Sequence, residues 1–126
     1  MKWSQGMRKA LSIHVLGTLL AISPNLSAKR VAHQPVPPVV SANIIYSAQG
    51  DGRTGYVVAN EVATGKELWR AKIFHIHVKA WLEEDNQWIF ISDLKLSDDA
   101  LVVRDERSRC YRVDLASRHV QKSRCA

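Results

Sequence analysis

Residues 55–69 predict a β-hairpin, and this segment constrains the fold more than any other part of the chain. Val57 and Val58 are β-branched residues, which favour an extended strand. In the tight turn that follows, Gly65 can adopt the positive φ that such turns often need. Trp69 comes after the turn, so its ring can pack back on the preceding strand as a core anchor. The hairpin therefore predicts an antiparallel β protein with Gly65 and Trp69 as structural residues.

The same hairpin resembles the blade repeat of quinoprotein-type (PQQ-like) β-propellers, in which an apolar strand precedes Ala-Thr-Gly-Lys-x-x-Trp. The family usually has Asp where this chain has Asn60 or Glu61. The resemblance implies a β-meander in which Thr-Gly forms the hairpin turn and the Trp packs between blades. It does not imply a bound quinone or any other cofactor, because nothing here matches the family's cofactor or calcium ligands. The matching residues are Val57, Val58, Ala59, Ala63, Thr64, Gly65, Lys66, Glu67, Leu68 and Trp69.

A diverged copy of the turn follows 53 residues later, where residues 116–119 take the place of residues 63–66. The two blade-like units are separated by an insertion at about residues 74–96. A closed propeller needs at least four blades of about 40 residues or more, so this chain is too short to form one. The alternatives are a partial propeller that self-associates and a small antiparallel meander curved into a barrel or sandwich.

The apolar pattern within residues 66–78 favours the barrel or sandwich. Ala71 and Ile73 share one face of the expected strand, whereas Phe74 and Ile76 fall on the other. A strand changes its buried face in this way at a β-bulge or at a bend from one sheet into another. The switch therefore predicts a curved or closed sheet rather than a flat one.

About seven strands are expected in an all-β domain that covers residues 43–126. Within residues 88–96, Phe90, Leu94 and Leu96 are expected to face the core. The acidic stretch 80–87 is irregular and has room for one helical turn. The expected strands cover residues 43–48, 56–62, 66–78, 88–96, 101–104 and 109–115, and a last one begins at Val120.

Residues 1–28 have the pattern of a secretory signal peptide. Three basic residues precede an apolar run of 12 residues, and Ala28 offers a small residue for cleavage. The run is shorter than the roughly 20 residues that a membrane-spanning helix needs, so an uncleaved anchor is the minor alternative. We therefore expect a signal helix, cleavage after Ala28, no membrane span afterwards, and a periplasmic or extracellular location.

Residues 29–42 contain three prolines and predict an extended arm ahead of the β domain. Without the signal, fifteen basic and twelve acidic residues remain, so the net charge falls from +6 to +3. A charge of +3 spread over strands does not make the clustered basic surface that nucleic-acid binding requires. Residues 81–99 carry a net charge of −5 and residues 104–126 a net charge of +4, so these segments could attract each other within one copy or between copies.

His75 and His77 form the best candidate for a chemical site. Residues i and i+2 of a strand point to the same face, so both imidazoles could bind one metal ion. The alternative is a polar, solvated strand face that continues to Lys79, whose charge would disfavour a bound cation. A third ligand would have to come from Glu83, Glu84, Asp85 or His119.

The two cysteines of the chain are Cys110 and Cys125. An exported domain meets an oxidising compartment, where the two could form a disulfide. Cys110 should point outward, because it alternates onto the strand face that carries Arg112 and Asp114. The sequence leaves open whether the two thiols pair, stay free, or bond to another chain.

The sequence contains no Gly-x-Ser-x-Gly elbow and no protease-like surroundings for a cysteine, so it gives no indication of catalysis. The preferred hypothesis is a small exported β domain that binds a protein partner or self-associates in the cell envelope. The alternative is a metal-binding protein or metal-dependent enzyme that uses His75 and His77.

Overall fold

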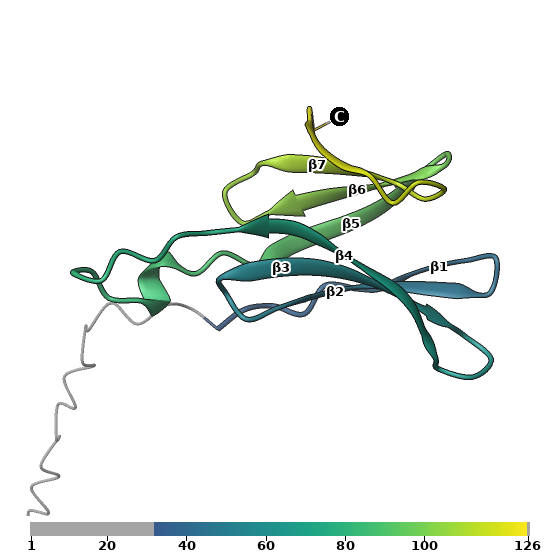
Figure 1. The fold of residues 1–126 in the computed structure, drawn as a ribbon, viewed down its shortest axis with the longest axis horizontal. Coiled ribbons are helices and arrows are strands. Elements are labelled where there is room, and N and C mark those ends of the chain that lie inside the picture. The colour runs from purple at the N-terminus through teal and green to yellow at the C-terminus, as the bar shows by residue number, and fades with distance from the viewer. Residues whose placement is uncertain (1–31, 126) are drawn as a thin grey trace, which may run out of the picture.

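The computed structural model describes residues 32–125 as two four-stranded antiparallel sheets (Figure 1). The all-β class expected from the sequence is confirmed, with eight strands in this part of the chain and a single turn of 3-10 helix, η1 (Asp85–Gln87). The first sheet contains β1 (Val39–Ser41), β2 (Ile44–Gly50), β3 (Thr54–Glu61) and β4 (Glu67–His75). The second sheet contains β5 (Ile91–Ser97), β6 (Ala100–Asp105), β7 (Cys110–Asp114) and β8 (Val120–Ser123).

Each sheet is a meander in which consecutive strands are neighbours, and the two sheets lie face to face (Figure 1). Strand β5 lies against β1 and β2, and β8 lies against β4, so the strands of the two sheets are stacked in the same order. Of the two predicted forms, a barrel or a sandwich, barrel closure is not found among residues 32–125. Strands β4 and β5 are not paired, so the two sheets remain separate. The segment between these strands leads from the last strand of the first sheet to the first strand of the second sheet.

The predicted signal peptide, residues 1–28, lies outside the described residues. Between residues 32 and 125, no helix has the length and apolar character needed to cross a membrane.

The end of the expected extended arm forms a strand, β1, which pairs with β2. Ala42 and Asn43 both have positive φ, at 49° and 63°, and form the two-residue turn of this hairpin. The arm docks because Val36 and Val39 pack against the apolar core between the sheets. His33 also stacks on the ring of Phe90, with ring centroids 4.4 Å apart.

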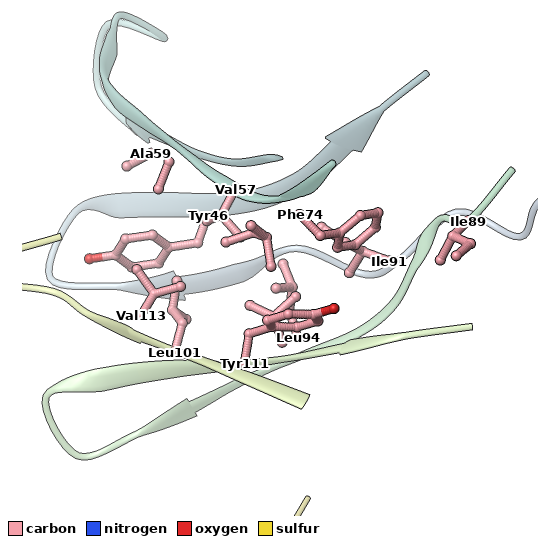
Figure 2. Close-up of a cluster of buried hydrophobic side chains, with 13 residues drawn as sticks. Tyr46, Val57, Ala59, Phe74, Ile89, Ile91, Leu94, Leu101, Tyr111 and Val113 are labelled. Carbon is pink, nitrogen blue, oxygen red and sulfur yellow. The ribbon is translucent and has the colours of Figure 1, made fainter. Parts of the chain in front are cut away.

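The core lies between the two sheets and takes one face from each (Figure 2). Tyr46 and Val57 of the first sheet face Leu101, Tyr111 and Val113 of the second (Figure 2). These side chains alternate along their strands with residues that point to the other face of the sheet, as the period-2 geometry of a strand requires. Tyr111 and Val113 are buried on the face opposite to the one that carries Arg112 and Asp114.

The parity switch predicted in β4 is present as a β-bulge. Gly55 is paired with Phe74 and Tyr56 with Lys72, so Ile73 is the extra residue and both Ile73 and Phe74 are buried. The ring of Phe74 lies over Gly55, where an added Cβ would come within 2.7 Å of the ring. The bulge therefore depends on a glycine in the neighbouring strand.

The assignment of core residues in β5 was partly wrong. Leu94 is buried as expected, but Ile91 takes the place given to Phe90, which is half-buried and lies before the strand. The reason is a register shift between Ile91 and Asp93, which brings Ile91 onto the inner face. Leu96 has the same parity as Leu94 but remains 39% exposed, because β5 is the edge of its sheet.

The 53-residue offset in the sequence corresponds to two turns of the same geometry. Gly65 ends the first turn with a φ of 72°, and Arg118 occupies the equivalent place in the β7–β8 turn with a φ of 64°. Each turn is closed by an equivalent backbone hydrogen bond and by an equivalent hydrogen bond from a backbone N–H to a side-chain hydroxyl. The matched bonds are Gly65 N to Glu61 O (2.8 Å) and Arg118 N to Asp114 O (2.7 Å), then Lys66 N to Thr64 Oγ1 and His119 N to Ser117 Oγ (3.2 Å each).

Trp69 is half-buried rather than a fully buried anchor. Its ring is tilted against Tyr46, with centroids 6.0 Å apart, and the guanidinium of Arg118 lies 5.6 Å from its centroid. Trp69 therefore lies at the rim of the core, where it connects the first sheet with a turn of the second.

Replacing Trp69 with Ala should lower the free energy of unfolding by about 2 kcal/mol, less than the 3–5 kcal/mol of a fully buried aromatic residue. Urea denaturation of the variant and the parent measures this difference. Arg118→Gly serves as the control. It removes the cation near the ring but relieves a positive φ, so its net effect should be below about 1 kcal/mol. Equal stability of Trp69→Ala and the parent would show that the ring does not contribute to the core.

Candidate functional site

The residues after β4 help to enclose a hollow beside the predicted histidines, with a volume of about 420 Å³. Strand β4 ends at His75, and the next residue, Ile76, is held by a backbone bond to Arg53 O (2.8 Å). This bond keeps the segment beyond β4 close to the β2–β3 loop. The lining residues are Arg53, His75, Ile76, His77, Val78, Ala80 and Glu84.

His75 and His77 come together as the sequence predicted, although His77 lies beyond the end of the strand. Their rings are perpendicular, with centroids 5.6 Å apart, and both side chains are exposed. Nδ1 of His75 is 2.7 Å from the hydroxyl of Thr54. One imidazole therefore already has a protein partner in this structure.

Two of the carboxylates proposed as third ligands already have hydrogen-bond partners, and Asp85 begins helix η1. Nε of Arg53 donates to Oε1 of Glu84 (2.7 Å), and Nδ2 of Asn86 donates to Glu83 Oε2 (3.0 Å). Within residues 32–125, no three His, Cys, Asp or Glu side chains are grouped so that they could hold a metal ion.

His119 is also separated from the histidine pair. It follows Arg118, which contacts Trp69 near the start of β4, whereas His75 ends that strand. Six residues of extended chain separate Trp69 from His75, which corresponds to roughly 20 Å. The hollow thus combines two imidazoles with a guanidinium–carboxylate pair and can offer hydrogen bonds to a polar group.

We expect the purified protein to contain the same amount of metal with or without His77. The reason is that two imidazoles beside a guanidinium do not provide the three or four ligands of a protein zinc site. Elemental analysis of the parent, the His77→Ala variant and a His119→Ala control measures this. A stoichiometric metal that is lost only in His77→Ala would contradict the expectation and favour the metal-binding hypothesis.

A loop made of residues 79–88, here named the Gln87 loop, is fixed by one amide side chain. The Lys79 N–H donates to Gln87 Oε1 (2.7 Å), and Gln87 Nε2 lies within hydrogen-bond distance of the carbonyls of Lys79 (3.0 Å) and Glu83 (3.2 Å). Helix η1 lies within this loop, which projects beyond one end of the sheets, at the left of Figure 1. Its ordered shape depends on contacts that composition does not reveal, so the sequence indicated only an irregular acidic stretch.

Asp105, at the end of β6, is a buried charged residue that the sequence analysis did not single out. Only 1% of it is exposed. Its Oδ1 accepts from the backbone N–H groups of Arg107 (2.9 Å) and Arg109 (3.0 Å), and its Oδ2 accepts from Arg109 Nε (2.8 Å) and the Tyr111 hydroxyl (3.2 Å). Burial, together with the charge of Asp105, raises the pKa of Tyr111, so the phenol stays protonated and able to donate.

Asp51 has the matching role in the β2–β3 loop of the first sheet. Its Oδ1 accepts from the backbone N–H groups of Arg53 and Thr54, both at 2.9 Å. These bonds lower the pKa of the Asp51 carboxyl. The shared arrangement identifies both aspartates as turn-forming residues. An Asp at the same place in two hairpin loops is the sequence signal that could have indicated the role of Asp105.

Cys110 and Cys125 are joined by a disulfide, with their Cα atoms 5.2 Å apart. Cys110 is on the outward face of β7, as its alternation with Arg112 predicted, since Arg104 and Ser123 are its cross-strand neighbours. It is nevertheless only 5% exposed, because the bridge brings the C-terminal segment over it. The bridge fixes the segment after β8 against the β6–β7 hairpin.

No protein-family model matches this chain, and no curated protein matches it either. A functional assignment has to come from the arrangement of residues 32–125 and from the sequence that precedes them.

Proposed function

We propose that this chain is a small exported domain that binds a protein partner or assembles with itself in the cell envelope. The observation that carries the proposal is the Gln87 loop, which holds two large apolar side chains in water. Trp81 is 79% exposed and Leu82 is 51% exposed. Exposed apolar groups on an ordered loop are typical of interaction sites, and Trp is the residue most enriched among those that dominate binding energy.

The polar groups that could suggest catalysis have structural partners instead. The imidazole of His75 contacts Thr54, and the carboxylate of Asp105 accepts four hydrogen bonds from its own hairpin. A catalytic acid or base needs a position from which it can reach a substrate proton. These partners support a binding role over an enzymatic one, whereas the closeness of His75 and His77 favours the metal-binding alternative.

Export is supported by two independent features of the chain. Residues 1–28 have the pattern of a signal peptide, and Cys110 and Cys125 lie where a disulfide can form. The two four-stranded units with equivalent turns also support the proposed likeness to blades of a quinoprotein-type propeller. In this proposal the chain is a pair of blade-like sheets that serves as a scaffold for the Gln87 loop.

Cell fractionation followed by mass measurement tests the proposed function. We expect the protein in the envelope fraction to begin at Lys29 and to migrate on native gels as a complex larger than one chain. A full-length protein in the cytoplasm, or a single chain in every envelope extract, would contradict the proposal. The same protein with the Gln87 loop replaced by a short Gly-Ser linker is the control for complex formation.

A further inference from the structure

A small hollow lies directly beside the exposed part of the Gln87 loop. Its volume is about 240 Å³, below the roughly 300–1,000 Å³ of small-molecule pockets. Ile76 and the buried Ile89 supply its apolar surface, whereas Lys79 and Arg107 supply its positive charge, since Arg109 is paired with Asp105. Leu82 and Gln87 of the loop, together with His77, complete the lining. Its size and surface fit a single large apolar side chain that is flanked by acidic residues.

Trp81 has the complementary character. It is next to Leu82, which lines the hollow, but its own side chain points into solvent with 79% exposed. Acidic residues follow it at positions 83–85, and of these Glu84 is paired with Arg53. Glu83 and Asp85 therefore give the region around Trp81 a negative charge opposite in sign to the rim of the hollow.

We propose that two copies of this chain associate through this surface, with Trp81 of each copy inserted into the hollow of the other. The inference rests on the proposed function and names its partner as a second copy. A two-fold interface requires that the inserted group and its receiving site lie on one continuous patch, so that each copy gives and receives the same contact. Trp81 and the hollow meet this requirement, because Leu82 and Lys79 belong to both the Gln87 loop and the lining.

The fixed shape of the Gln87 loop contributes to this association. Its backbone is tied by Gln87 to the carbonyls of Lys79 and Glu83, so little conformational entropy has to be lost when Trp81 becomes buried. Opposite charges on the loop and on the rim align the two copies and speed their encounter. The association should therefore weaken as the salt concentration rises.

Sedimentation equilibrium of the protein as recovered from the cell tests the proposal, with Trp81→Ala as the first variant. We expect a dimer whose dissociation constant rises about 30-fold in this variant, a loss of about 2 kcal/mol that is shared by the two symmetry-related Trp81 side chains. Val62→Ala is the matched control, since it truncates another exposed apolar side chain outside the Gln87 loop and should leave the dimer unchanged. Because Trp81 is largely in water, the melting temperature of its variant measured on the monomer should match that of the parent.

A charge exchange makes the test specific for the reciprocal geometry. Arg107→Glu alone, and the double variant Glu83→Lys with Asp85→Lys alone, should each dimerise more weakly than the parent. An equal mixture of the two should recover a mixed dimer, because the reversed charges then face each other in one half of the interface and the unchanged charges face each other in the other half. A parent dimer that is insensitive to Trp81→Ala, or a mixture that gains nothing, would overturn the proposal.

The remaining outcome separates this inference from the proposed function. A parent protein that is monomeric at every concentration excludes the self-association. If such a monomer still occurs in an envelope complex with a different protein, the binding function stands and the second-copy partner is wrong. If no complex is found in the envelope either, both proposals fail.

Discussion

Replacing Asp105 with Ala should lower the free energy of unfolding by roughly 3–4 kcal/mol, since a buried donor left without its acceptor costs about 1–3 kcal/mol. The substitution removes the acceptor for two backbone N–H groups of the β6–β7 hairpin and for the buried hydroxyl of Tyr111. Arg109 loses its partner too, but its side chain is partly exposed and water can replace the carboxylate. Chemical denaturation followed by Trp fluorescence measures the change.

Asp51→Ala is the matched control for this prediction. Asp51 accepts two backbone bonds in the equivalent loop of the first sheet, but its side chain is exposed, so water can take the place of the carboxylate. Its loss should cost about 1 kcal/mol, the net value of an ordinary hydrogen bond. Tyr111→Phe removes only the phenol hydroxyl and leaves the backbone bonds of the turn intact, so it should also cost about 1 kcal/mol. If Asp105→Ala were no less stable than Asp51→Ala, burial of the carboxylate would not matter to the fold.

Local sequence patterns predicted those parts of the fold that depend on neighbouring residues. The hairpin around Gly65 and the bulge at Ile73 follow from turn chemistry and from the period of the apolar residues, and both are present. Strand β1 was missed because prolines dominate its segment, and its pairing depends on burying Val39 against distant strands. The core face of β5 was partly wrong because the register shift at Ile91 is set by its pairing with β6.

The candidate site shows the same limit. An i, i+2 spacing was sufficient to bring His75 and His77 together, but the pairing of Glu84 with Arg53 joins residues 31 positions apart and could not be read from spacing. Asp105 lies in a run of charged residues that resembles a solvated turn, and only the packing of Tyr111 against it reveals the burial. Long-range contacts, rather than residue types, therefore decide which polar groups are available for binding.

The disulfide should contribute about 3 kcal/mol to stability, because closing a loop of about 15 residues restricts the unfolded chain by this amount. Cys110 and Cys125 are 15 positions apart, and the bridge ties the C-terminal segment to the outer face of the second sheet. Cys125→Ala is the better variant for the test, since it leaves a buried thiol at Cys110. Cys110→Ser would instead bury a hydroxyl without a partner, which has a cost of its own.

Urea denaturation of the oxidised parent, the reduced parent and Cys125→Ala measures the contribution. The reduced parent and the variant should be equally destabilised, and reductant should not affect the variant further. Thiol titration of denatured protein from the envelope should find no free thiols, and two free thiols per chain would show that the bridge does not form. A dimer that dissociates on reduction would place the bond between chains, whereas the association proposed for Trp81 is not covalent and should persist in reductant.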